Sequence, residues 1–164
     1  MTAGRRLGQG VLVLLFAAAA RPASAQHTVT VTVPAGVGFS VRDVATSTSG
    51  TPGSTQITWS TAVGFGSNEK FKVSVQPDSS SFSGPGTTHI VASKVSWTAS
   101  ETSGNASNGT LAAGAYTQVF VSPNKLKTTS SGSITLNWTL AAIAAAGLRS
   151  GTHTLTVRWK FEMF

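Results

Sequence analysis

The feature of the sequence that most constrains the fold is a period-two alternation of apolar and polar residues in short runs. Successive side chains of a β-strand point to opposite faces, so such runs are typical of strands with one buried face. Segments rich in Gly, Ser and Thr separate the runs, as expected for connections between strands. Eight runs follow this pattern: 27–33, 37–44, 54–61, 70–76, 89–97, 116–122, 133–140 and 155–163.

The apolar members of each run are expected to face the core. The inward residues predicted in this way are Val29, Val31, Val33, Val37, Phe39, Val41, Ile57, Trp59, Phe71, Val73, Val75, Val91, Val95, Trp97, Ile134, Leu136, Trp138, Leu140, Leu155, Val157, Trp159, Phe161 and Met163. A bulge is expected at 92–93, and the run 116–122, apolar on both faces, predicts a central strand or a domain contact. The alanine-rich stretch 140–151 predicts one or two helical turns that Gly147 would end.

Eight strands and little helix predict an all-β domain. Two polar connections, 77–88 and 100–110, are too long for tight hairpins and favour crossings between two sheets. The expected fold is therefore a single immunoglobulin-like antiparallel β-sandwich with Greek-key connections. A closed barrel is the alternative. Four tryptophans each follow an apolar residue two positions earlier, which favours burial in the core over exposed platforms for sugars.

The first 25 residues have the layout of a cleavable signal peptide. Arg5 and Arg6 precede an apolar run at 11–20, and Ala23 and Ala25 have the spacing that a signal peptidase reads before Gln26. The apolar run is too short to span a membrane, and no other stretch is long enough. We expect residues 26–164 to form one exported domain, extracellular, at the cell surface or periplasmic. The absence of a cysteine at position 26 argues against a lipoprotein anchor.

The composition offers few groups for chemistry. Without the signal, nine basic residues face five acidic ones, a net charge of +4, and the basic residues are too scattered for a nucleic-acid surface. The chain has no cysteine, its three histidines lie on separate segments, and it has no nucleophile elbow. These observations predict a protein that is not an enzyme, with no cofactor, no metal and no catalytic residues.

Both ends of the mature chain resemble exported bacterial surface proteins with immunoglobulin-like sandwiches. Chaperone–usher pilus subunits carry a glycine fourteen residues from the C-terminus, then alternating apolar residues, then a penultimate tyrosine. Gly151 stands at the glycine position, the alternation follows at Leu155, Val157, Trp159 and Phe161, and Met163 replaces the tyrosine. The cysteine pair frequent in those subunits is absent. The resemblance implies that 27–41, with Val29, Val31 and Val33, could donate a strand to a neighbour.

The chain also resembles the WxL cell-surface domain, because Trp138-Thr139-Leu140 forms a W-x-L and 159–161 matches a second one loosely. Together, the two resemblances imply a secreted structural or adhesive protein, fimbria-like, that assembles by strand exchange. Its expected partners are other copies of the chain or a periplasmic chaperone. The alternative is a carbohydrate- or cell-wall-binding module that uses the loops 77–88 and 100–115 with Tyr116 or an exposed tryptophan.

Overall fold

A computed structural model describes residues 29–33, 37–61, 68–101, 105–127, 130–143 and 147–164. The expected signal peptide and its cleavage residues Ala23, Ala25 and Gln26 lie outside the described residues. The strands are β1 (Val29–Thr32), β2 (Phe39–Val41), β3 (Thr48–Thr61), β4 (Phe71–Pro77), β5 (Val95–Glu101), β6 (Gly109–Thr110), β7 (Thr117–Val121), β8 (Ser131–Leu140), β9 (Gly151–His153) and β10 (Val157–Met163). One short 3-10 helix, η1 (Ala92–Lys94), precedes β5.

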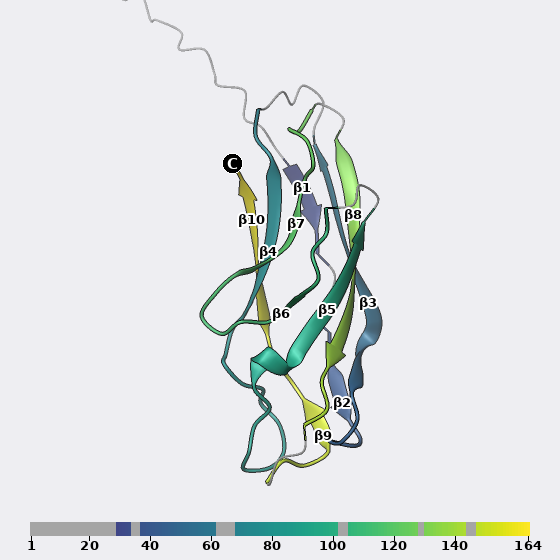
Figure 1. The fold of residues 1–164 in the computed structure, drawn as a ribbon, viewed down its shortest axis with the longest axis vertical. Coiled ribbons are helices and arrows are strands. Elements are labelled where there is room, and N and C mark those ends of the chain that lie inside the picture. Colours follow the sequence, from purple (N-terminus) through teal and green to yellow (C-terminus); the bar gives the residue numbers. More distant parts are fainter. Residues whose placement is uncertain (1–28, 34–36, 62–67, 102–104, 128–129, 144–146) are drawn as a thin grey trace, which may run out of the picture.

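The strands form antiparallel sheets, and the two larger sheets face each other (Figure 1). The larger has the order β1-β3-β8-β5-β6, the second has the order β10-β4-β7, and β2 and β9 form a separate pair. Side chains from both large sheets meet between them. The rings of Trp59 on β3 and Phe71 on β4, for example, have centroids 5.5 Å apart. The prediction of an all-β antiparallel fold is confirmed.

Most neighbours within a sheet are distant in sequence. Within the two large sheets, β5 and β6 are the one neighbouring pair that is also consecutive in the chain. The expected crossing at 77–88 is confirmed, because this connection leads from β4 in one sheet to β5 in the other. The crossing expected at 100–110 is met in part: residues 105–107 bond to β7 in the second sheet, and β6 then returns to pair with β5 in the first.

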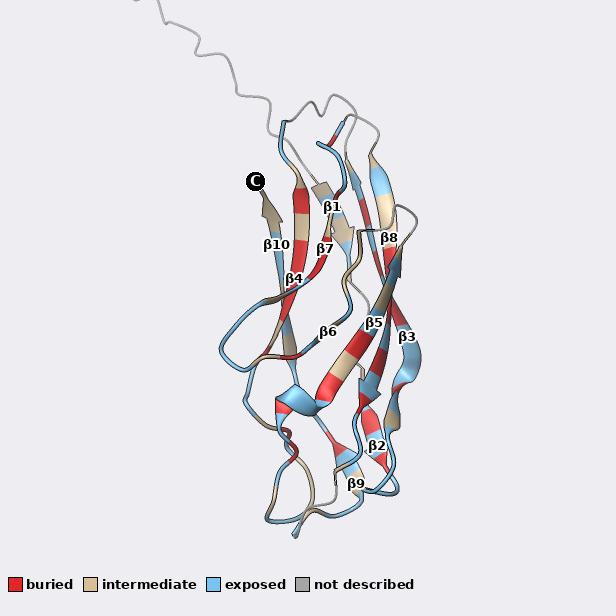
Figure 2. Ribbon diagram, in the orientation of Figure 1, coloured by how far each residue is buried: buried red, intermediate tan, exposed pale blue. Residues whose placement is uncertain are grey.

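The core follows the alternation closely on the long strands. On β8, Ile134, Leu136, Trp138 and Leu140 are buried, and the residues between them are half-buried or exposed (Figure 2). β3 and β4 behave in the same way, although Ser74 on β4 is buried as well. Burial of one apolar face on each sheet supplies the main driving force for this fold.

Two local predictions are wrong, and in both the backbone departs from a regular strand. Val91 is 47% exposed because η1 follows it, while Ile90 and Ala92 are buried instead. The strand β7 is the last strand of its sheet and not a central one, although residues 105–107 bond to its outer edge; the other alternative, a domain contact, stays a prediction. Its consecutive residues Val119 and Phe120 are both buried because the register with β4 shifts there, a bulge that inserts one extra residue.

The remaining predictions are met in part. Three of the four tryptophans, Trp59, Trp97 and Trp138, are buried, whereas Trp159 is half-buried. The stretch 140–151 contains no helix among its described residues, and 144–146 lie outside them. In the part of the chain that the structure describes, no helix has the length and apolar character needed to cross a membrane.

Candidate functional site

One side of the sandwich is closed by a segment that bonds to both sheets. The amide of Ser107 donates to the carbonyl oxygen of Val119 on β7 at 2.8 Å, and β6 immediately afterwards pairs with β5. The indole Nε1 of Trp97 donates to the carbonyl of Ser107 at 2.9 Å. The chain between β5 and β7 therefore bridges the two sheets with main-chain hydrogen bonds.

The opposite side of the sandwich carries two segments, one with β1 and β2 and the other with β9 and β10. The two segments pair with each other at one end only. β2 pairs with β9, so that Phe39 lies opposite His153 and Val41 opposite Gly151. Gly151 has φ +142°, and a Cβ there would lie 2.8 Å from Cγ of Pro85. Both facts favour glycine at this position, which is the glycine singled out by the pilus resemblance.

Beyond this junction the two strands separate into different sheets. Toward the N-terminus the chain continues as β1, which pairs with β3, and toward the C-terminus it continues as β10, which pairs with β4. In the order of the strands, β1 is the last strand of the larger sheet and β10 the last strand of the second sheet; both are labelled in Figure 1. Among the described residues, no strand pairs with the outer edge of either one. We call this region the open side.

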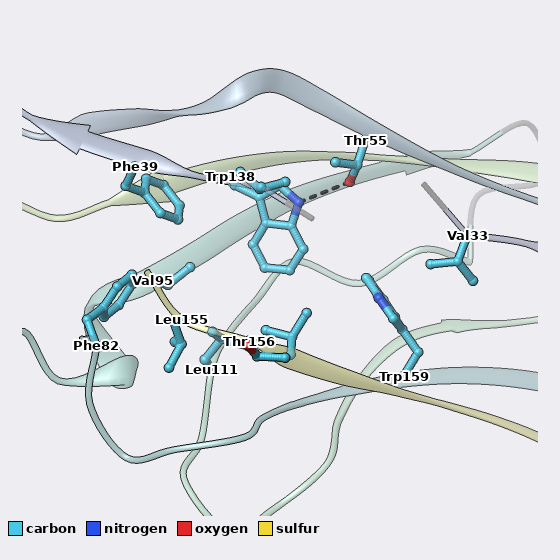
Figure 3. Close-up of a pocket in the computed structure, with 12 residues that line it drawn as sticks. Val33, Phe39, Thr55, Phe82, Val95, Leu111, Trp138, Leu155, Thr156 and Trp159 are labelled. Carbon is cyan, nitrogen blue, oxygen red and sulfur yellow. Dashed lines mark hydrogen bonds between the residues drawn. The ribbon is translucent and has the colours of Figure 1, made fainter. Parts of the chain in front are cut away.

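An apolar cavity of about 350 Å³ lies between the sheets on the open side. Half of its lining comes from the segments that diverge there: Val33, Val37, Leu155, Thr156, Val157 and Trp159. The other half comes from Phe39, Thr55, Phe82, Val95, Leu111 and Trp138. Phe39 and Phe82 lie at one end of the cavity and Val33 and Trp159 at the other, with Trp138 between them (Figure 3).

One buried hydrogen bond fixes the centre of the cavity wall. The indole Nε1 of Trp138 donates to Oγ1 of Thr55 at 3.0 Å (Figure 3). Trp138 also contacts Trp159 edge-on, with ring centroids 6.4 Å apart at 72°. The two indoles and the hydroxyl are thus held in place relative to one another, across both sheets.

The backbone of β10 presents its free groups on the open side in a regular pattern. Lys70 and Phe164 exchange two hydrogen bonds, of 2.8 and 3.1 Å, which makes them a hydrogen-bonded pair of the β4–β10 ladder. Such pairs alternate with pairs whose peptide groups point away. The alternation directs the peptide groups of Trp159, Phe161 and Met163 to the free edge, while their side chains lie on the core-facing side of the strand.

The same reasoning applies to β1. The amide of Thr61 bonds to Ser130, on the β8 side, so the adjacent Ser60 is the residue that bonds to Thr30 of β1. The peptide groups of Val29 and Val31 then point to the outer edge. Each edge strand therefore offers unpaired peptide groups on the residues that carry its apolar side chains.

Charged side chains cover the solvent face of β10. The carboxylate of Glu162 accepts from Lys160 at 2.7 Å and from Lys72 at 3.0 Å, and Arg158 pairs with Asp78. The hydrogen bond from Lys160, followed by that from Lys72, lowers the pKa of Glu162 below its ordinary value of 4.5. These pairs lie on the face of the sheet opposite the cavity, so the apolar lining of the cavity carries no charge.

The structure brings together most residues predicted for strand exchange. Val29 and Val31 lie on β1, Gly151 on β9, and Val33, Leu155, Val157 and Trp159 line the cavity. Phe161 is farther along β10, 37% exposed and stacked on Phe71 at 6.2 Å, and Met163 lies opposite Phe71. Sequence reasoning did not select Thr55, Phe82 or Leu111, which reach the cavity from the middle of the chain.

The loops expected for glycan binding offer fewer aromatic platforms than predicted. Three indoles are buried, which leaves Tyr116, 43% exposed, as the aromatic side chain available from the loop before β7. The ammonium of Lys160 lies 5.7 Å from the centroid of its ring. The described residues contain no group of three or more His, Asp or Glu side chains that could hold a metal ion.

Comparisons with known proteins give no relative from which a function could be transferred. No family model, no curated protein and no solved structure matches the chain.

Proposed function

We propose that this is a secreted, non-enzymatic structural or adhesive protein of the cell surface that assembles in a fimbria-like manner through the open side of its sandwich. The observation that carries the proposal is the position of β1 and β10, two edge strands on the same side with unpaired outer peptide groups among the described residues. Exposed strand edges are templates for pairing with another chain.

We infer that β1 is the strand exchanged. Cleavage at the expected site would leave three residues before β1, so the segment available for exchange is the strand itself. β1 is held by four residue pairs, Val29 to Thr32 with Thr58 to Thr61, and carries no charged side chain. A copy of β1 from a neighbour would make the same pairs, so exchange costs few native contacts.

The finer features of the fold belong to the same proposal. An immunoglobulin-like sandwich with Greek-key connections is supported by the crossings between sheets, and export by the signal-like layout of residues 1–25. The partners are other copies of the chain, with a periplasmic chaperone as a candidate for covering the open side before assembly.

The absence of native cysteines permits a clean test of exchange. Thr30 and Ser60 are Cα partners and both side chains are exposed, so T30C/S60C places two thiols within disulfide reach. We expect light scattering to show concentration-dependent oligomers of the exported protein. Oxidised oligomers should then run as covalent ladders on non-reducing gels, and dilute monomers as single chains.

The control is T30C alone, which cannot form the intrachain bridge. Monomers at every concentration would refute assembly. Oligomers whose disulfides are all within one chain would refute exchange of β1 while leaving assembly intact.

A second candidate function is a carbohydrate- or cell-wall-binding module, and the exposed ring of Tyr116 favours it. Aromatic faces can bind sugar rings by stacking, and Tyr116 is the ring that the loop before β7 exposes. Sedimentation of the protein with purified cell-wall polymer tests this candidate. Tyr116→Ala should abolish cosedimentation, whereas the exposed Val91→Ala should leave it unchanged.

A further inference from the structure

The cavity on the open side has the size and lining of a small-molecule site. The cavity has a volume of about 350 Å³ and is partly open to solvent. It falls within the range of about 300–1,000 Å³ typical of ligand sites. An apolar cavity of about 150 Å³ is sufficient for benzene, so this one has room for a molecule of roughly two rings.

The lining determines the chemical class of molecule that would fit. Ten of the twelve lining side chains are apolar and four of these are aromatic, while the other two are threonines. No ionisable side chain is among them, so a charged group would be buried there without a partner. An uncharged, largely aromatic molecule satisfies both conditions.

Thr55 adds one directional polar contact. It is 3% exposed, and its Oγ1 accepts the hydrogen bond from Trp138. A hydroxyl that accepts one hydrogen bond still has its own proton to donate. A ligand with a single acceptor oxygen would receive that proton, and the indoles of Trp138 and Trp159 would contact its rings.

We propose that the cavity between β1 and β10 binds an uncharged two-ring aromatic molecule, or one of similar size and polarity, whose single acceptor oxygen is held by the hydroxyl of Thr55. This site is independent of the proposed assembly function. It rests on the cavity, the buried hydroxyl and the two indoles, rather than on the free strand edges.

The test uses two uncharged probes of nearly the same shape. 2-Acetylnaphthalene carries one acceptor oxygen and 2-ethylnaphthalene carries none. Calorimetric titration of the dilute, monomeric exported protein should show saturable binding of one molecule per chain for both. The acetyl probe should bind roughly three- to tenfold more tightly, the gain expected from one hydrogen bond.

Variants at Thr55 test the anchor. T55V keeps the shape but removes the hydroxyl, so it should remove the preference for the acetyl probe, and T55S should restore the preference. A loss of affinity that is equal for both probes would overturn the role of Thr55. Near-ultraviolet circular dichroism, to which all four tryptophans contribute, checks that the aromatic packing of T55V is unchanged.

Variants in the lining test the location. V157F should fill part of the cavity and lower the affinity for both probes at least tenfold. V91F, a matched change at an exposed position outside the cavity, should leave both affinities unchanged. The proposal is overturned if neither probe binds saturably or if V157F binds as tightly as the parent protein.

Discussion

The gap between the two sheets is closed differently on the two sides of the sandwich. On the β6–β7 side, the segment 105–110 bonds first to one sheet and then to the other, and the ring of Trp97 packs beneath it. On the β1–β10 side, the strands are joined through β2 and β9 at one end and diverge at the other around an apolar cavity. On the closed side, the chain's own hydrogen bonds join the two sheets. On the open side, two edge strands and the cavity remain available to another strand or to a ligand.

The difference shows which residues support the fold and which are available for function. On the closed side, peptide groups are paired and large side chains are fully buried, so changes there should cost stability. On the open side, the side chains of Val29, Val31 and Trp159 are half-buried, and the outer peptide groups of β1 and β10 have no strand partner among the described residues. Changes there should affect association or binding more than folding.

The largest contrast is expected between two tryptophans. Trp97→Ala removes a side chain that is 2% exposed and its bond to Ser107, and should lower the free energy of unfolding by about 3–5 kcal/mol. Trp159→Ala removes a half-buried indole and should cost roughly 1–2 kcal/mol. Urea denaturation of both variants measures the contrast, and equal losses would break the distinction between the sides.

A smaller effect is expected from a glycine on the closed side. A Cβ at Gly109 would lie 2.4 Å from Cζ2 of Trp97, a rigid ring that is itself buried. Gly109→Ala should therefore destabilise the protein by about 1–3 kcal/mol through overpacking. Gly53→Ala is the control, because a Cβ at Gly53 meets nothing within 4 Å. A G109A protein as stable as G53A would show that the closed side is loosely packed.

The smallest effect is expected from the charges on β10. The pKa of Glu162 is lowered, so its stabilising contribution is present above pH 4.5 and is lost as the pH falls through the lowered pKa of the folded state. Glu162→Gln should lower the melting temperature slightly at pH 7, and the difference should shrink as the pH falls below 4.5 and through the lowered pKa. A difference that does not shrink on acidification, or that does not shrink in 1 M salt, would assign the effect to something other than these ion pairs.

The alternation in the sequence predicted the inward residues of the long strands because side-chain direction is a local property. Ile57, Trp59 and Ile134 follow directly from it. The same pattern failed at Val91, which is exposed because a 3-10 helix follows it; an irregularity was expected at 92–93, but as a bulge. The run 116–122 was apolar on both faces, so the alternation could not assign one inward face, and a bulge there buries Val119 and Phe120 in succession.

Of the candidate site, only the residues on the first and last strands were predicted from the sequence. The alternation identified the strands that contain Val31 and Trp159, but strand order depends on pairings between distant segments. Thr55 and Phe82 enter the cavity because β3 and the β4–β5 connection lie beside the point where the first and last strands separate. Without the sheet order, nothing in the sequence distinguishes Thr55 from the other threonines of the chain.

Amide hydrogen exchange of the dilute monomer tests the central claim most directly. If the β10 edge is open, the amides of Lys160 and Glu162, which face β4, should exchange slowly, and those of Trp159 and Phe161 should exchange quickly. The amide of Ser107 on the closed side should also be slow. Protection of Trp159 and Phe161 equal to that of their neighbours would show that the edge is covered within one chain, and would contradict the account.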